Sequence, residues 1–195
     1  AHGRDHVTKA QLAMDKDGKF LALRVDTTAA MGAYLSTFST AVPTILYGTL
    51  LAGQYTTPSI YVEVTAVFTN TAPVDAYRGA GRPEAAYLLE KLVDACARDL
   101  KMSPAEIRRR NFIRPEQFPY TTATGRKYDV GEFDGHMTLA MERADWNGFE
   151  KRLKASKQAG KLRGIRIATH VPACALARSE AAVLPLNGDG TVTLF

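Results

Sequence analysis

A short segment with two glycines and two arginines is the part of the sequence best suited to chemistry. In Ala76-Tyr77-Arg78-Gly79-Ala80-Gly81-Arg82-Pro83-Glu84-Ala85, the small residues precede a predicted helix. Amides without side-chain bulk at a helix N-terminus can approach an anion or an oxygen-rich cofactor closely. The segment is not a dinucleotide-binding fingerprint, because Glu84 stands where the third glycine belongs. On these residues alone, a tight strand-to-helix turn with two solvent-exposed arginines is the simpler interpretation.

Other catalytic and metal-binding patterns are mostly missing from the sequence. It contains no Gly-x-Ser-x-Gly elbow, no Gly-x-x-x-x-Gly-Lys-Ser/Thr loop and no His-Glu-x-x-His motif. His2 and His6 could share a helix face, but their place near the start of the chain disfavours a metal site. His136 and His170 have no partner at ligand spacing. We therefore expect no metal ligand among the histidines.

Composition limits the class of protein. The chain has 195 residues, 46% of them hydrophobic, which is enough to bury a sizeable core. Its two cysteines, Cys96 and Cys174, are too few for a disulfide scaffold and favour a reducing, cytoplasmic compartment. No run approaches the ~18 apolar residues that cross a membrane. We expect a globular protein without a membrane span.

The net charge of +5 is unevenly distributed. Residues 98–127 carry eight Lys or Arg against three Asp or Glu, and residues 143–166 carry eight against two. Solvated helix faces are the simpler explanation, and an anionic partner or an acidic neighbouring subunit is the alternative. No aromatic residue alternates with Arg108-Arg109-Arg110, so nucleic-acid binding is disfavoured.

The first third of the chain reads as strands. Residues 7–14 and 20–25 flank Asp15-Lys16-Asp17-Gly18, a strong hairpin signal. Residues 29–58 are dense in Gly, Ser, Thr and Pro, which predicts a long, ordered but irregular connection. Residues 60–68 alternate, with Ile60, Val62, Val64, Ala66 and Phe68 on one face, so we expect a further strand.

Helices are predicted next, and then strands again. Leu89, Leu92, Val93, Cys96 and Leu100 form one helical stripe, in which Cys96 is a core residue. Further helices are expected from the capping box Ser103-Pro104-Ala105-Glu106, from Asp129 to Ala144 with Glu132 near its start, and from Phe149 to Gly160. Strands are expected at 165–171, 181–186 and 191–195, with a turn at 187–190. The predicted class is α+β: strands with a hairpin, a helical middle, then the first strands of a second α+β domain.

The glycine-containing segment resembles the active-site loop of the molybdenum-binding large subunit in the xanthine dehydrogenase, aldehyde oxidase and carbon monoxide dehydrogenase family. The resemblance extends along essentially all 195 residues. It includes Gly3-Arg4-Asp5-His6, Asp15-Lys16-Asp17-Gly18, Gly32-Ala33-Tyr34-Leu35, Arg108-Arg109-Arg110-Asn111-Phe112, Gly125-Arg126-Lys127-Tyr128-Asp129, Gly164-Ile165 and Asp189-Gly190-Thr191-Val192.

The resemblance implies a molybdenum hydroxylase with molybdopterin, in its cytosine dinucleotide form, and iron–sulfur and FAD centres on partner subunits or domains. By position, Tyr77, Arg78, Gly79, Ala80 and Gly81 would bind the cofactor. Arg78, Gly79 and Ala80 would lie beside the molybdenum centre, with the backbone near Ala80 meeting a metal-bound oxygen. Arg78 and Arg82 would be the catalytic residues, and Arg82 and Tyr77 would support the loop or approach the substrate. Residues 1–114 would end the first cofactor-binding domain, and residues 115–195 would begin the second.

Two departures from the family narrow this expectation. Carbon monoxide dehydrogenases of the family carry a copper-binding cysteine where Gly79 stands, and xanthine dehydrogenases carry a phenylalanine where Ala80 stands. The loop is more similar to that of bacterial enzymes acting on aldehydes or aromatic heterocycles. The family's catalytic glutamate and other cofactor-binding segments have no counterpart here, so we expect a fragment that is inactive alone. The alternative function is a basic module binding nucleic acid or an acidic partner.

Overall fold

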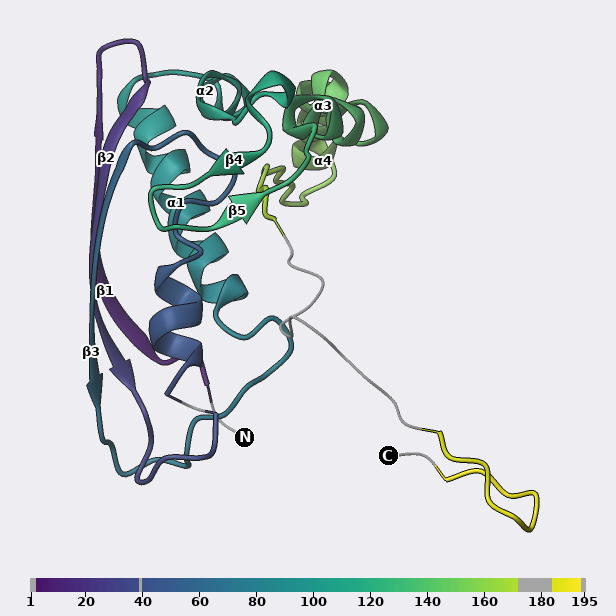
Figure 1. Cartoon of the computed structure of the whole chain (residues 1–195). Coiled ribbons are helices and arrows are strands. Elements are labelled where there is room, and N and C mark those ends of the chain that lie inside the picture. The colour runs from purple at the N-terminus through teal and green to yellow at the C-terminus, as the bar shows by residue number, and fades with distance from the viewer. Residues whose placement is uncertain (1–2, 39, 172–183, 194–195) are drawn as a thin grey trace.

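A three-stranded sheet with helices on one face forms the body of the molecule. The computed structural model describes residues 3–38, 40–171 and 184–193. In chain order the elements are β1 (His6–Met14), β2 (Phe20–Ala30), the π-helical turn η1 (Val42–Leu46), β3 (Ser59–Val67), α1 (Arg82–Asp99), α2 (Pro104–Asn111), η2 (Pro115–Gln117), β4 (Tyr120–Thr121), β5 (Lys127–Tyr128), α3 (Phe133–Arg143), η3 (Trp146–Gly148) and α4 (Phe149–Gln158). Figure 1 shows α1 and the η1 segment beside the sheet, with α3 and α4 projecting at one end. The predicted α+β class is confirmed.

The predicted hairpin is confirmed and extends further than the sequence indicates. β1 and β2 pair antiparallel from His6–Ala29 to Met14–Phe20, and β2 continues to Ala30. A bulge near the turn shifts the register between Ala13 and Met14. Because of this shift, Phe20 is buried on the same face as Leu23 and Val25, although simple alternation would not place it there.

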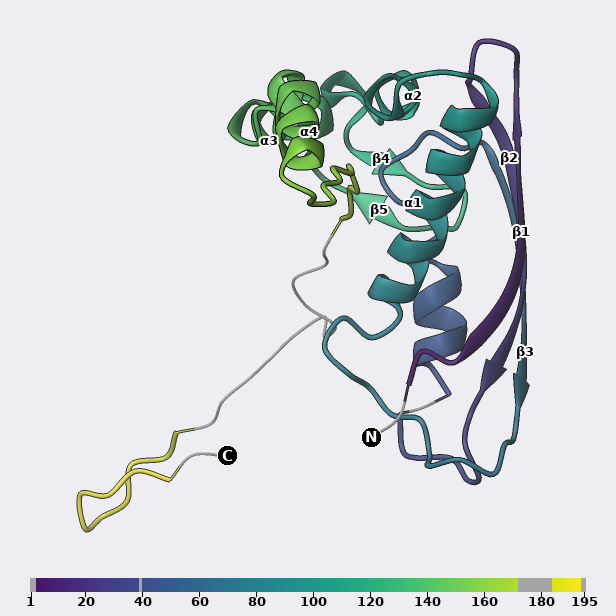
Figure 2. The same ribbon diagram turned by 180° about the vertical axis from the view of Figure 1, so that it is seen from behind.

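Strand β3 pairs with β2 in parallel, so the intervening residues must cross over the sheet. The irregular connection expected at 29–58 does so, but its first residues belong to β2 and its middle contains η1. Seen from behind, η1 and α1 lie against the same face of the sheet (Figure 2). Ile60, Val62 and Val64 pack against the core as predicted, whereas Phe68 lies beyond the end of β3 and is exposed.

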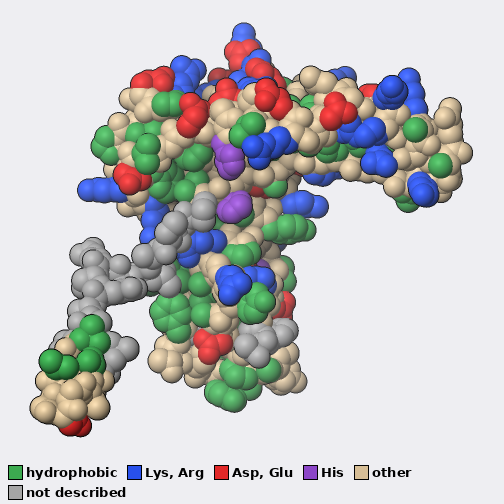
Figure 3. All heavy atoms as spheres, turned by 90° about the vertical axis from the view of Figure 1, so that its right-hand side faces the viewer, with side chains coloured by type: hydrophobic (Ala, Val, Ile, Leu, Met, Phe, Trp, Pro, Cys, Tyr) green, Lys and Arg blue, Asp and Glu red, His purple; other side chains and the backbone are tan. Residues whose placement is uncertain are grey.

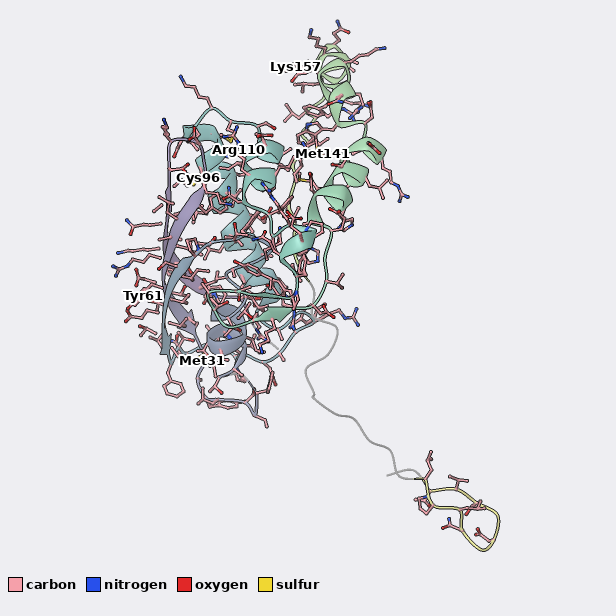
Figure 4. The ribbon with its side chains drawn as sticks, turned by 45° about the horizontal axis from the view of Figure 1, so that its top comes forward. Met31, Tyr61, Cys96, Arg110, Met141 and Lys157 are labelled. Carbon is pink, nitrogen blue, oxygen red and sulfur yellow. The ribbon has the colours of Figure 1, made fainter. Side chains whose placement is uncertain are left out.

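Helix α1 supplies the other side of the core. Leu89, Val93 and Cys96 are buried, as the predicted stripe requires, and Ala85 and Ala97 are buried with them. Figure 4 shows Cys96 on this helix and Tyr61 on the opposite, outer face of the sheet. Burial raises the pKa of the Cys96 thiol, so this cysteine is a packing residue rather than a nucleophile. Cys174 lies outside the described residues.

The later helices begin close to their predicted positions, with different capping. Ser103 accepts a hydrogen bond from the amide of Ala105 at 3.3 Å, so it is the N-cap of α2. The expected capping box is incomplete, because Glu106 pairs with Arg110 at 2.8 Å instead of reaching back. Glu132, not Asp129, caps α3 by accepting from Gly135. Helix α4 matches the predicted basic helix.

The expected strand at 165–171 is wrong. The segment has the alternating burial of a strand, but no strand pairs with it among the described residues. Instead the amide of Thr169 donates to Glu90 Oε2 on α1 at 2.9 Å. The turn at 187–190 is present, with one bridge between Leu186 and Val192. The remainder of the strand expected at 181–186, and the end of the one at 191–195, lie outside the described residues.

Candidate functional site

The loop before α1, residues Tyr77–Gly81, has three consecutive residues with left-handed backbone. The φ angles are +104° at Gly79, +37° at Ala80 and +88° at Gly81. Two turns close it: the Ala80 amide donates to the Tyr77 carbonyl at 2.9 Å, and the Arg82 amide donates to the Gly79 carbonyl at 3.0 Å. Glycine adopts such angles without steric cost, which explains two of the three residues. Ala80 holds the conformation at a cost, and such strain often accompanies functional loops.

The loop rests directly on the crossover segment. A Cβ atom at Gly81 would lie 2.7 Å from both the Tyr47 nitrogen and the Val42 carbonyl oxygen. At Gly79 a Cβ would lie 2.8 Å from the ring of Pro83. Neither contact leaves room for a side chain, so both glycines serve close packing as well as the turn. The loop therefore packs directly against the π-helical turn η1 and the residue that follows it. π turns are frequent near functional sites.

Several amides of this loop lack an intramolecular acceptor. Within the described residues, the amides of Arg78, Gly79 and Gly81 donate to no backbone or side-chain oxygen, whereas that of Ala80 is used in the turn. The loop also lies at the positive end of the α1 dipole, and Pro83 in the first turn has no N–H to offer. Unpaired donors at a helix N-terminus suit an anionic or oxygen-rich ligand. The Ala80 amide, near which the resemblance implies a cofactor contact, is not available as a donor in this structure because it is used in the turn. The cofactor contacts of Gly79 and Gly81 stay a prediction.

The side chains predicted to act at this site lie in different environments. Tyr77 and Arg78 are exposed, and the described residues provide no partner for the Arg78 guanidinium. Arg82 turns back onto the loop, where its Nη1 donates to the Gly79 carbonyl at 3.2 Å. Its Nε is buried without a hydrogen-bond partner. Arg82 therefore supports the loop within this chain, while Arg78 stays free to contact a ligand.

Arg4 also belongs to this site, and the site prediction omits it. Its guanidinium contacts the carbonyl of Arg78, the ring of Tyr77 and the carboxylate of Glu84. Glu84 is largely buried, and its second oxygen has no partner. The one signal in the sequence is Gly3-Arg4-Asp5-His6, which the family resemblance includes but to which no role is assigned.

The histidines form no metal cluster in the part of the chain that the structure describes. His6 lies on β1, with its ring edge-on to Tyr47 at 5.1 Å between centroids. Burial lowers the pKa of His6, while Glu84 and Asp5 act in the opposite direction. His2 lies outside the described residues, so of the two histidines considered as a metal-binding pair only His6 has a described position.

The three consecutive arginines of α2 are each engaged with acidic side chains. Arg108 is fully buried and contacts Glu90 and Asp94 at 2.8 and 3.0 Å. Arg109 pairs with Asp134 at 2.7 Å, and Arg110 pairs with Glu106. Over the upper part of the molecule, basic side chains lie among acidic ones rather than forming a uniform patch (Figure 3). These pairings argue against a phosphate-binding role for the triplet.

Among the helices that the structure describes, none has the length and apolar character needed to span a membrane.

Comparisons with known proteins identify the family to which the chain is similar. Residues 1–112 match the family model "Molybdopterin cofactor-binding domain". The carbon monoxide dehydrogenase large chain of Hydrogenophaga pseudoflava is 38% identical over 175 residues, 87% of this chain and 22% of that protein. The 6-hydroxypseudooxynicotine dehydrogenase complex subunit gamma of Paenarthrobacter nicotinovorans is 28% identical over 100% of this chain and 25% of its own length.

A solved structure has the same fold over most of the chain. Quinoline 2-oxidoreductase from Pseudomonas putida 86 superposes with a TM-score of 0.76 at 34% identity, covering 82% of this chain and 20% of that one. The chain thus spans only a fifth to a quarter of the length of the relatives it matches.

Proposed function

This chain belongs to the family of molybdopterin cofactor-binding domains, and from that premise we propose that it forms one wall of the molybdenum-cofactor site in the large subunit of an oxidoreductase. The observation that carries the proposal is the set of unpartnered amides at Arg78, Gly79 and Gly81. These donors, at the positive end of α1, match the phosphate and oxygen atoms of a molybdopterin dinucleotide in chemistry and charge.

The residues of the loop bind and orient. The amides of Gly79 and Gly81 donate to acceptor atoms of the cofactor, because neither has an acceptor among the described residues of the chain. Arg78 presents a free guanidinium towards the ligand, and Arg82 keeps the Gly79 carbonyl in place. When bound, the cofactor supplies the redox chemistry that transfers water-derived oxygen to a carbon of the substrate.

The loop composition favours aldehydes or aromatic heterocycles as substrates. Gly79 cannot ligate copper, so oxidation of carbon monoxide is disfavoured even though a relative at 38% identity carries that name. Ala80 offers no aromatic platform for a purine. The quinoline 2-oxidoreductase similarity supports a heterocycle.

The wider assembly follows from the same proposal. We assign residues 1–114 to the end of a first cofactor-binding domain and 115–195 to the start of a second. The partners are the rest of the large subunit and the subunits or domains carrying iron–sulfur and flavin centres. The name of one relative, a dehydrogenase complex subunit, supports such an assembly. The cofactor is the cytosine dinucleotide form, and the compartment is the cytoplasm.

The proposal is tested on the complete large subunit with its partner subunits. Molybdenum and pterin nucleotide are quantified, and turnover is measured with an aldehyde, an N-heteroaromatic compound and carbon monoxide. Arg78→Ala should lower kcat about 100-fold without lowering the unfolding temperature. Arg114→Ala, at an arginine that is 71% exposed, should leave turnover unchanged. A complete protein without molybdenum, or an Arg78→Ala variant with full activity, would refute the proposal. We expect the 195-residue chain alone to turn nothing over.

A further inference from the structure

Arg4 contacts the loop at two points and the first turn of α1 at a third, although it lies 74 residues before Arg78. Its Nη2 donates to the Arg78 carbonyl at 3.1 Å, and its Nε lies 3.4 Å from Glu84 Oε1. The guanidinium carbon lies 5.2 Å from the centre of the Tyr77 ring. A planar guanidinium can serve these three groups together, because its donors diverge in one plane while its face stacks on the ring.

The contact with the Arg78 carbonyl fixes an amide of the proposed site. That carbonyl and the N–H of Gly79 belong to one planar trans peptide, so they point in opposite directions. Holding the carbonyl against Arg4 therefore turns the Gly79 N–H away from Arg4. This N–H is one of the amides without an intramolecular acceptor. Nothing else in the described residues bonds to the Arg78 carbonyl.

Two further features show that the chain is adapted to this arrangement. The backbone of Arg4 is left-handed, with φ at +66°, a conformation that residues other than glycine adopt at a cost. Glu84, in the first turn of α1, has a side chain only 7% exposed, and in the described part of the chain its one ion pair is with Arg4. Loss of Arg4 would leave this carboxylate buried without a counter-charge next to the loop.

We propose that Arg4 is a positioning residue of the cofactor site, which orients the Gly79 amide by holding the Arg78 carbonyl and ties the loop to the first turn of α1. The inference rests on the proposed function for the identity of the ligand. Its structural part, the ordering of the loop by Arg4, can be measured without any cofactor.

The first experiment uses the 195-residue chain. Trypsin cuts after Arg78 only when the loop opens, and Pro83 protects the bond after Arg82. Arg4→Gln should speed cleavage between Arg78 and Gly79 at least about tenfold, because the closed state loses one hydrogen bond and Glu84 loses its counter-charge. Arg24→Gln is the matched control, because Arg24 also pairs with one carboxylate, Asp26, and stacks at 5.2 Å over a tyrosine, Tyr61, but lies away from the loop. It should cleave like the parent chain.

A second variant covers the case in which Arg4→Gln does not fold. Arg4→Lys keeps a charge for Glu84 but cannot donate to the carbonyl and stack on Tyr77 with the same geometry. Its cleavage should be faster than that of the parent chain and slower than that of a foldable Arg4→Gln chain. If the Arg4 variants that fold are cleaved between Arg78 and Gly79 no faster than the parent chain, the inference is wrong.

The second experiment uses the complete enzyme. Arg4→Lys should lower kcat about tenfold with KM within twofold of the parent value, because the substrate contacts are intact while the donor to the cofactor is misdirected. An unchanged kcat overturns the positioning role. The two proposals can fail separately. If the Arg4 variants loosen the loop but the complete protein holds no molybdenum, the ordering of the loop by Arg4 stands and the proposed function is refuted.

Discussion

The contact between Gly81 and the π-helical turn η1 can be tested by adding a single methyl group. In Gly81→Ala, the new Cβ would lie 2.7 Å from two backbone atoms of the η1 segment, which cannot rotate away as a side chain could. The left-handed φ of +88° costs about 1 kcal/mol for alanine, and the overlap adds about 2 kcal/mol. We expect a loss of about 3 kcal/mol, or about 9 °C in the unfolding temperature of a chain this long.

Gly125→Ala separates the two contributions. Gly125 has nearly the same φ, +81°, but a Cβ there would meet no atom within 4 Å. Its alanine variant should therefore lose only about 1 kcal/mol. Urea unfolding of both variants, followed by circular dichroism, gives the difference directly. Equal losses of stability at the two positions would show that the loop does not pack against η1.

Two further predictions concern buried groups near the core. Arg108→Met should destabilise the chain by about 4 kcal/mol, because it leaves Glu90 and Asp94 without their buried cation. Arg110→Met removes an exposed ion pair and should cost about 0.5 kcal/mol or less. Both losses are measured by urea unfolding, and similar values for the two variants would contradict the importance of the buried pairs. Burial lowers the pKa of His6, so the unfolded chain binds the proton more tightly and stability falls as pH drops through the unfolded value of about 6.5. His6→Phe should therefore lose less stability between pH 7.5 and 5.5 than the parent chain, and an equal loss would show that His6 does not contribute.

Elements with strong local signals could be predicted from the sequence. The Asp-Gly hairpin, the apolar stripe of α1 and the Ser-Pro start of α2 depend on neighbouring residues, and all three are present. The glycine turn before α1 belongs to the same group, because left-handed backbone and helix initiation are local requirements.

Features set by distant residues could not be predicted in this way. The parallel pairing of β2 and β3 depends on how the crossover packs, and nothing in the strand sequences specifies it. Arg108, Arg109 and Arg110 are consecutive residues of one type, yet only Arg108 of the three is fully buried, because two carboxylates of α1 face it. The segment 165–171 alternates like a strand, but the partner it meets is the Glu90 side chain.

The candidate site depends both on local sequence signals and on contacts with distant residues. Only the local part could be predicted from the sequence. The residues of the loop are recognisable because they are contiguous, but the shape of the loop depends on three other segments. Residues of η1 support Gly81, Pro83 packs on Gly79, and Arg4 holds the Arg78 carbonyl. Because each support comes from this chain, the amides are already oriented before any ligand binds. Such preorganisation lowers the entropic cost of binding, so the supports should matter to cofactor affinity as much as the residues that touch the cofactor.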